Sequence, residues 1–129
     1  QALTGAQLVV LALPLTPGSE GLIDARRLAL LAEGACLVNV ARGQHVVTDD
    51  VVAALRDGTL GSAGLDVTDP EPLPDGHPLW ALPNAIVTPH TANTEEMAEP
   101  RLGARVTENV RRWRVGEPLI GLVDPAAGY

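Results

Sequence analysis

The amino-acid sequence predicts an α/β fold, with a parallel sheet and flanking helices, and three features of the chain lead to that prediction. Short aliphatic runs alternate with segments that have the spacing of amphipathic helices. Glycine or proline follows most of these segments, where a chain has to turn. Polar side chains come just after several aliphatic runs, as at the ligand-binding edge of a parallel sheet. Strands that alternate with helices are joined by right-handed crossovers, which produce such a sheet.

The composition excludes several classes of function. The 129 residues are 46% apolar and 19% charged, which is typical of a globular domain with a core. Aromatic residues make up 2% and Phe is absent, so we expect an aliphatic core. The net charge of −7 argues against nucleic acid as a partner, and no apolar run approaches the roughly 20 residues of a membrane span. The single cysteine, Cys36, is expected to be buried in a protein of a reducing compartment, the cytoplasm.

The first half of the chain contains two predicted strands and one predicted helix. Residues 7–13 are predicted to form a strand, since residues 8–11 are continuously apolar, and Pro14 ends it. Asp24 is a candidate N-cap for a helix that runs to about Leu31 and ends before Gly34. Residues 37–41 follow as a strand that we expect to be buried on both faces.

The middle of the chain continues the alternation. Thr48 is the expected N-cap of a helix that ends at Gly58, with Val51, Val52 and Leu55 facing inward. Residues 60–67 form the third strand, and residues 85–88 the fourth. Between them, residues 69–78 contain four prolines, too many for a helix or a central strand, so we expect an ordered loop.

A long helix is predicted over residues 94–115. Its apolar face is made by side chains at four- and three-residue steps, namely Leu102, Val106, Val110 and Trp113. Pro100 either kinks the first turns or marks the true start of this helix. Gly116 ends it. We therefore divide the chain into residues 1–93, with the sheet, and residues 94–129, with the last helix and tail.

Four polar residues are expected to converge at the carboxyl edge of the sheet. Arg42, Asp66 and His90 each follow a predicted strand, and Glu71 lies in the loop just after Asp66. A histidine exchanges protons near neutral pH, and a carboxylate on its second ring nitrogen would orient it. An arginine binds a carboxylate with two parallel hydrogen bonds. The set suits protonation of a carbonyl beside a carboxylate while a hydride arrives from elsewhere.

Arg42 and His90 also have purely structural interpretations. Arg42 could be a surface residue paired with an acid, and His90 a buried histidine bonded to a carbonyl. His77, before Pro78, is expected to be structural, and His45 to pack in the core. Asp66, Glu71, His77 and His90 lack the close spacing typical of metal ligands, so no metal is predicted. Trp80 and Trp113 are expected to be core or interface anchors.

Three motifs in this order resemble the D-isomer-specific 2-hydroxyacid dehydrogenases. They are residues 39–43 (NVARG), residues 64–67 (GLDV) with residues 70–72 (PEP), and residues 78–80 (PLW) leading to Asn84 and to residues 88–90 (TPH). The resemblance covers essentially the whole chain, including the ending from Gly116 to residues 123–125. It implies a Rossmann-like fold, with this chain as the second half of a dinucleotide-binding domain.

The resemblance also implies roles for named residues. Arg42 would bind the substrate carboxylate, His90 would be the general acid and base, and Glu71 its carboxylate partner. Asp66 would bind the nicotinamide carboxamide. Further cofactor-binding positions are implied at Leu13, Pro14, Thr16, Val40, Ala41, Arg42, His90 and Ala92. The implied substrate is a small 2-hydroxy or 2-oxo acid, the cofactor NAD or NADP, and the assembly a homodimer.

The sequence departs from the family pattern in one respect. The fingerprint G-x-G-x-x-G, and the acidic residue that follows it and selects NAD over NADP, are absent from these residues. We therefore expect a partial chain that is inactive alone, with its cofactor preference unreadable. Two alternatives stay open, a dehydrogenase-like corepressor that binds the cofactor without turnover, and a folding unit with no activity of its own.

Overall fold

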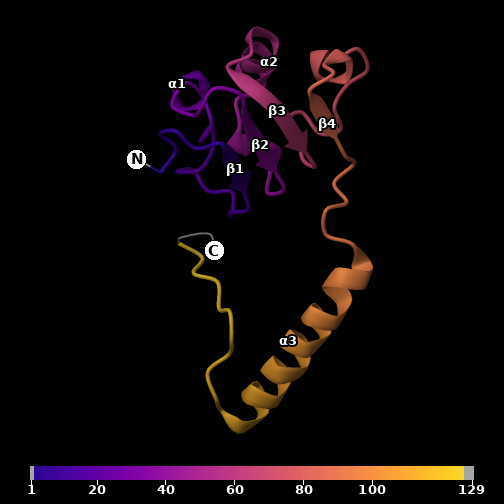
Figure 1. Cartoon of the computed structure of the whole chain (residues 1–129). Helices are drawn as coiled ribbons and strands as arrows, with labels where there is room; N and C mark the ends of the chain where they lie inside the picture. Colours follow the sequence, from indigo (N-terminus) through magenta and orange to yellow (C-terminus); the bar gives the residue numbers. More distant parts are fainter. Residues whose placement is uncertain (1, 127–129) are drawn as a thin grey trace. The chain divides into compact units, whose positions relative to one another are not determined.

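The computed structural model describes residues 2–126 and divides the chain into two compact units, residues 1–90 and 91–129. The first unit contains the sheet and two α-helices, and the second contains one long helix and an extended tail (Figure 1). Gln1 and residues 127–129, the outer ends of the two predicted segments, lie outside the described residues.

The sheet has four parallel strands, as predicted, and they lie in the order of the sequence, β1-β2-β3-β4. The strands are β1 (Leu8–Leu11), β2 (Ala35–Asn39), β3 (Leu60–Leu65) and β4 (Ala85–Val87). Strands β1, β3 and β4 end earlier than predicted, and β2 both begins and ends earlier. At β2 the reason is local, because the side chain of Asn39 accepts a hydrogen bond from the Ala41 N–H and turns the chain out of the sheet.

One face of the sheet holds the core of the first unit. Val9, Leu11, Leu37 and Leu65 are buried on it, and the two α-helices of the unit add side chains to the same cluster. The other face is open in β1, where Leu8 is 58% exposed. Cys36 and Val38 in β2 are only partly buried, so the predictions of a strand buried on both faces and of a buried cysteine were wrong.

Helix α1 (Ala25–Leu28) is a single turn, shorter than predicted. Its N-cap is Asp24, as expected, and the Asp24 carboxylate accepts a hydrogen bond from the Arg27 N–H at 2.8 Å. The chain then continues in tighter turns, with the N–H of Leu30 bonded to the carbonyl of Arg27. Gly34 therefore does not close this helix, and Leu30, expected to face inward, is 45% exposed.

Helix α2 (Thr48–Asp57) ends at Gly58 in the left-handed conformation, with φ of 85°, as predicted. Val51, Val52 and Leu55 are buried, also as predicted. The predicted N-cap was wrong. Val47 occupies that position, and the Thr48 hydroxyl instead donates to the carbonyl of Asp69 at 2.7 Å, which ties α2 to the proline-rich loop.

Two short 3-10 helices complete the first unit. The first, η1 (Gly43–His45), follows β2, and the second, η2 (Pro78–Ala81), ends the proline-rich loop. His77 caps η2, because its Nδ1 atom accepts a hydrogen bond from the Leu79 N–H at 3.2 Å, as expected of a structural residue.

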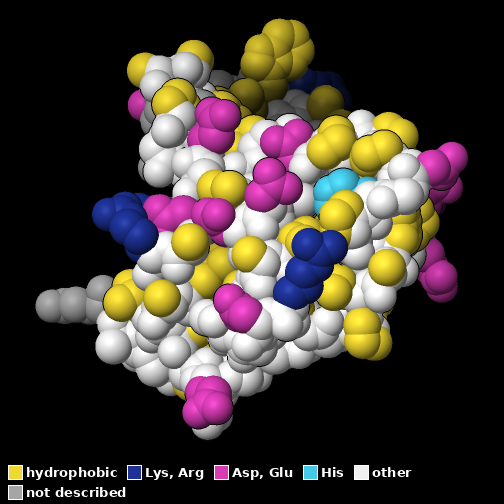
Figure 2. Space-filling model, turned by 90° about the horizontal axis from the view of Figure 1, so that it is seen from above, with side chains coloured by type: hydrophobic (Ala, Val, Ile, Leu, Met, Phe, Trp, Pro, Cys, Tyr) yellow, Lys and Arg dark blue, Asp and Glu magenta, His cyan; other side chains and the backbone are white. Residues whose placement is uncertain are grey.

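Acidic side chains are spread over the face seen in Figure 2, and basic side chains are fewer there.

Helix α3 (Glu95–Val115) begins after Thr94 and ends at Gly116, close to the prediction. Pro100 lies inside the helix, so it does not mark the start. The predicted apolar face exists, but no described side chain of α3 is buried, and Trp113 is 75% exposed. Trp80 is 54% exposed, so neither tryptophan is a core residue.

Within residues 2–126, no helix combines the length and the apolar character that crossing a bilayer requires.

Candidate active site

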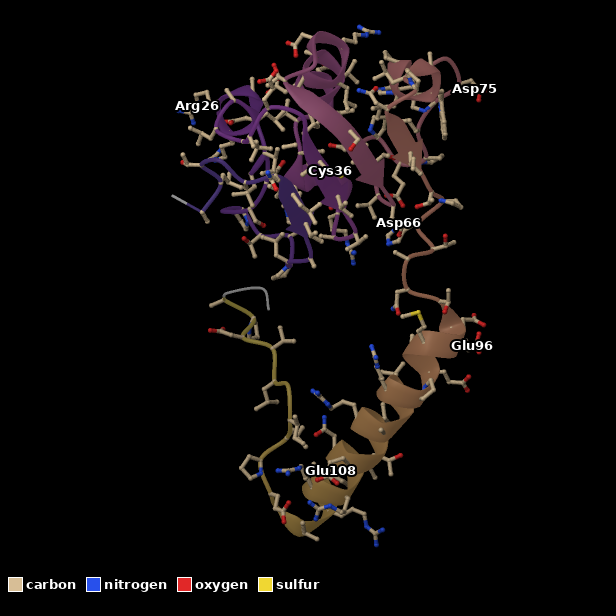
Figure 3. All side chains as sticks on the ribbon, viewed as in Figure 1. Arg26, Cys36, Asp66, Asp75, Glu96 and Glu108 are labelled. Atoms are coloured by element: carbon tan, nitrogen blue, oxygen red, sulfur yellow. The ribbon has the colours of Figure 1, made fainter. Side chains whose placement is uncertain are left out.

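The candidate site lies beyond the carboxyl ends of the strands, where the sequence placed it. Strands β2, β3 and β4 end shortly before Arg42, Asp66 and His90 respectively. Figure 3 shows Asp66 where β3 ends. The parallel arrangement directs all three strands to the same edge, so residues far apart in the sequence meet there.

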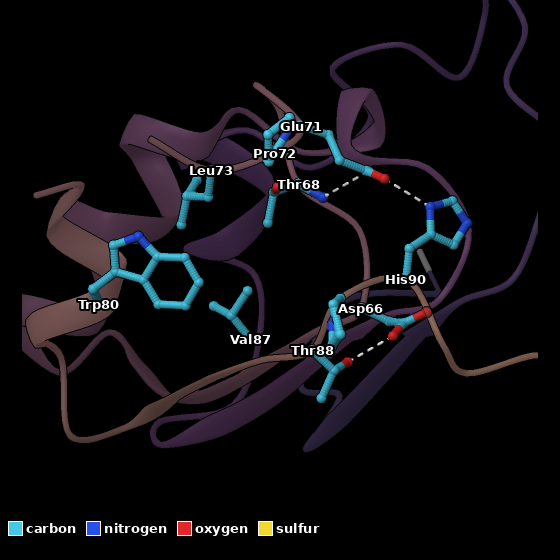
Figure 4. Close-up of a pocket in the computed structure, with 10 residues that line it drawn as sticks. Asp66, Thr68, Glu71, Pro72, Leu73, Trp80, Val87, Thr88 and His90 are labelled. Atoms are coloured by element: carbon cyan, nitrogen blue, oxygen red, sulfur yellow. Dashed lines mark hydrogen bonds and ion pairs between the residues drawn. The ribbon is translucent and has the colours of Figure 1, made fainter. Parts of the chain in front are cut away.

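His90 and Glu71 form a hydrogen-bonded pair at this edge (Figure 4). The Nδ1 atom of His90 lies 2.7 Å from the Oε1 atom of Glu71, and both side chains are partly exposed, at 47% and 41%. His90 has a left-handed backbone, with φ of 57°, which is uncommon outside glycine and clusters at functional sites. The pair therefore joins an unusual backbone to a proton-transfer group and a carboxylate.

The pKa of Glu71 lies below its ordinary value, chiefly because of the hydrogen bond with His90. Partial burial opposes this shift. The Thr68 N–H, 3.4 Å from the second carboxylate oxygen, and the charges of His90 and Arg42 lower the pKa further. Glu71 is thus held as a carboxylate, the form that accepts a hydrogen bond from an imidazole N–H.

Asp66 is the buried member of the set, at 6% exposed. The Thr88 hydroxyl donates to its Oδ1 atom at 2.6 Å, and its backbone N–H donates to the carbonyl of Asn39 at 3.0 Å. The sequence singled out Asp66 but gave Thr88 no role beyond its motif. The available signal was a hydroxyl on the last residue of a predicted strand, at the edge that also holds an aspartate.

A pocket of about 410 Å³ opens beside the His90–Glu71 pair. Asp66, Thr68, Glu71 and His90 form its polar wall, and Leu73, Trp80 and Val87 its apolar wall. This pocket could not be predicted from the sequence, because its apolar residues come from three separate segments, namely the proline-rich loop, η2 and β4. The pocket has room for a small organic molecule beside an acid–base pair.

Arg42 lies at the same edge but does not line this pocket. Its side chain is exposed, and its Nη1 atom donates to the carbonyl of Ala41 at 2.7 Å. Its charge contributes to the low pKa of Glu71, so the cation and the carboxylate share one electrostatic environment. The next residue must be glycine, because a Cβ atom on Gly43 would overlap the backbone of Thr68. That contact places the Arg42 loop against the loop of Glu71.

The residues predicted to flank the adenosine half of a cofactor follow β1. Thr16 and Pro14 are held by Ser19, whose buried hydroxyl lies 2.8 Å from the Thr16 N–H and donates to the Pro14 carbonyl at 2.9 Å. The carbonyl of Leu13 lies 3.1 Å from Nε2 of His45. No role was predicted for Ser19, because a serine in a proline-containing loop does not by itself indicate a structural hydrogen bond.

His45 is fully buried, as the packing interpretation predicted. Its Nδ1 atom lies 2.9 Å from the carbonyl of Ser19, so the ring ties η1 to the loop after β1. Both Val40 and Ala41 lie just past β2, where Val40 is 41% exposed and Ala41 is buried. Ala92 is exposed and belongs to the second unit. Among residues 2–126 there is no group of three His, Cys, Asp or Glu side chains that could hold a metal ion.

A parallel sheet with a histidine–glutamate pair, a buried carboxylate and a cation at its carboxyl edge is typical of ligand-binding α/β domains. The family model described as the NAD-binding domain of D-isomer specific 2-hydroxyacid dehydrogenases matches residues 1–92. The chain belongs to this family.

Among curated proteins, the chain is 47% identical over 124 residues to an uncharacterized protein in the proB 3′ region of Corynebacterium melassecola. It is 40% identical over 128 residues to glyoxylate/hydroxypyruvate reductase A of Serratia proteamaculans. These alignments cover 96% and 98% of the chain but only 41% and 40% of the relatives. The chain thus spans about two fifths of the length of these curated relatives.

Solved structures agree with this assignment. A D-isomer specific 2-hydroxyacid dehydrogenase from Xanthobacter autotrophicus Py2, in complex with NADPH and MES, is 48% identical with a TM-score of 0.85, covering 98% of this chain and 52% of that one. An NADPH-dependent glyoxylate/hydroxypyruvate reductase from Sinorhizobium meliloti, in complex with NADP and sulfate, is 36% identical with a TM-score of 0.85, covering 95% and 40%. The Rossmann-like fold is therefore shared with NADP-binding relatives.

Proposed function

We propose that the chain is part of an NAD(P)-dependent oxidoreductase that transfers a hydride between the cofactor and C2 of a D-2-hydroxy or 2-oxo acid. Residues 1–93 would form the C-terminal half of the cofactor domain, and residues 94–129 a C-terminal helix and tail. The observation that carries this proposal is the bond between His90 and Glu71 at the edge of the sheet, beside the buried Asp66.

His90 would exchange the proton with the substrate oxygen. Its Nδ1 atom faces the Glu71 carboxylate, which leaves Nε2 as the ring nitrogen for the substrate. Glu71 would fix the tautomer and stabilise the imidazolium, since its lowered pKa keeps it ionised. Arg42 would bind the substrate carboxylate and polarise the neighbouring carbonyl, a role that its exposed guanidinium permits.

The residues present fit the nicotinamide end of a cofactor. Asp66 is a buried carboxylate held by Thr88, and such a fixed acceptor suits the amide of a carboxamide. Val40 offers an exposed apolar side chain just beyond β2. Leu13, Pro14 and Thr16 would lie by the adenosine half, with Ala41, Arg42, His90 and Ala92 as further cofactor contacts. Bound NAD(P) would supply the hydride chemistry.

The relatives favour a small substrate. Two of them carry the name glyoxylate/hydroxypyruvate reductase, so we infer a 2-oxo acid of similar size, with either NADH or NADPH as reductant. A homodimer and a cytoplasmic location are part of the same proposal, and the free Cys36 fits a reducing compartment.

A turnover assay tests the proposal in the whole protein that contains this chain. A panel of 2-oxo acids, including glyoxylate and hydroxypyruvate, is offered with NADH and with NADPH, and loss of cofactor absorbance is followed. We expect turnover with at least one pair. Cofactor binding without turnover on any panel member would contradict the proposal and favour the corepressor alternative.

A further inference from the structure

Asn39 is a buried polar side chain for which the proposed chemistry has no use. It is the last residue of β2 and is fully buried. A buried amide is costly unless its donors and acceptor are bonded. The bonds that satisfy Asn39 therefore indicate what it holds in place.

Both ends of this amide bond to the loop that carries Arg42. The Oδ1 atom accepts from the Ala41 N–H at 3.0 Å, and the Nδ2 atom donates to the Arg42 carbonyl at 2.8 Å. The guanidinium of Arg42 in turn donates to the Ala41 carbonyl at 2.7 Å. The peptide group before Ala41 is thus held through its N–H by the Asn39 side chain. The peptide group after Ala41 is held through its carbonyl by the guanidinium of Arg42.

The backbone of Asn39 links the same loop to the neighbouring strand. Its carbonyl accepts a hydrogen bond from the Asp66 N–H at 3.0 Å. One residue therefore contacts the backbone on either side of the site, at Arg42 and at Asp66. Its side chain lies inside the protein, so it acts on the site only through these neighbours.

We propose that Asn39 is a positioning residue that sets the direction of the Arg42 side chain by closing the turn between β2 and η1. This inference rests on the proposed function of Arg42 as the cation that binds the substrate carboxylate. Asn39 contacts neither substrate nor cofactor. Without the Asn39 amide, the Arg42 carbonyl loses its donor at 2.8 Å and is left with the His45 N–H at 3.2 Å, and the guanidinium, anchored on Ala41, loses a fixed support.

The test is a double-mutant cycle of Asn39→Asp and Arg42→Ala in the whole protein, assayed with the 2-oxo acid that turns over. Aspartate keeps the acceptor for Ala41 but lacks the N–H that donates to Arg42. We expect Asn39→Asp to raise KM about tenfold with little change in kcat. In the Arg42→Ala background the same change should alter kcat/KM by less than about twofold, because coupled residues are not additive.

Asn84→Asp is the matched control. Asn84 also donates its side-chain amide to backbone carbonyls, those of Leu55 at 3.0 Å and Gly61 at 3.2 Å, but just before β4 begins, at the opposite end of the strand from the site. Both aspartate variants should lower the melting temperature, and only Asn39→Asp should raise KM. If Asn39→Asp does not fold, Asn39→Ser, whose hydroxyl retains one bond, goes through the same cycle.

The outcomes separate the inference from the proposed function. If Arg42→Ala alone leaves KM unchanged, the role of Arg42 in the proposed function fails. The positioning role is wrong if Arg42→Ala raises KM but the Asn39 variant lowers kcat/KM by the same factor in the wild type and in Arg42→Ala. It is also wrong if Asn39→Asp raises KM no more than Asn84→Asp does.

Discussion

The imidazole Nδ1 of His90 and the carboxylate Oε1 of Glu71 lie 2.7 Å apart, although their backbones belong to different loops of the sheet edge. This contact is exposed enough for a substrate to reach, at 47% and 41% of the two side chains. Because the ionised Glu71 carboxylate accepts a hydrogen bond, it favours the tautomer of His90 that carries the proton on Nδ1. The contact also predicts how variants at His90 and at Glu71 will behave.

The first prediction concerns kinetics in the whole protein. His90→Ala should lower kcat by about 10²- to 10⁴-fold, the usual contribution of a general acid or base. Arg42→Ala should chiefly raise KM, by about 10- to 100-fold, because it removes a charged hydrogen bond to the substrate. His77→Ala is the control, since the His77 side chain caps η2 and does not line the pocket. Near-wild-type kcat in His90→Ala would show that another group transfers the proton.

The second prediction concerns pH and stability. The folded-state pKa of Glu71 lies below its ordinary value of 4.5, so the His90 contact stabilises the protein above that pH and is lost as the pH falls through the lowered pKa. Glu71→Gln should therefore be less stable than the wild type at neutral pH, and the two should converge on acidification. Urea unfolding at several pH values measures the difference, with the exposed Glu33→Gln as the control. A difference independent of pH would contradict a contribution from the ionised Glu71 carboxylate.

The third prediction compares two glycines of β3. A Cβ atom on Gly61 would overlap the carbonyl of Gly34, with its carbon at 2.8 Å, whereas on Gly64 the nearest atom is a methyl of Val38 at 3.9 Å. Gly61→Ala should cost about 2 kcal/mol, a typical penalty for overpacking. Gly64→Ala should change stability by less than about 1 kcal/mol. Thermal unfolding of the two variants decides this, and equal losses would mean that the backbone moves to relieve the overlap.

The fourth prediction concerns α3. Hydrogen bonds from Arg111 and Arg112 lower the pKa of Glu108 from 4.5 to about 2. This contribution to helix stability is present above pH 4.5 and is lost as the pH falls toward 2. Glu108→Gln should reduce the helical circular dichroism signal on heating at neutral pH but not at the acid end. Glu99→Gln, in the same helix, is the control, and an equal effect of both variants would contradict the prediction.

Much of the fold could be predicted from local patterns. The aliphatic runs, the glycines after α2 and α3, and the aspartate before α1 specify strands, helix ends and one cap by chemistry within a few residues. One error arose where a distant part of the chain competes, and others have a local cause, such as the early end of β2 at Asn39. Thr48 bonds to Asp69 instead of capping its own helix, and Leu30 faces outward because α1 is one turn long.

The sequence by itself determined that Arg42, Asp66 and His90 follow successive parallel strands, and hence that they share one edge. Only the tertiary structure decided which of them touch. Glu71 reaches His90 from a loop whose first residues bond back to Thr68, and the Arg42 loop approaches Thr68 because Gly43 has no side chain. The apolar wall of the pocket likewise comes from segments with no common periodicity. Local spacing specifies the element to which a residue belongs, whereas contacts between loops depend on packing across the sheet, which no short stretch of sequence encodes.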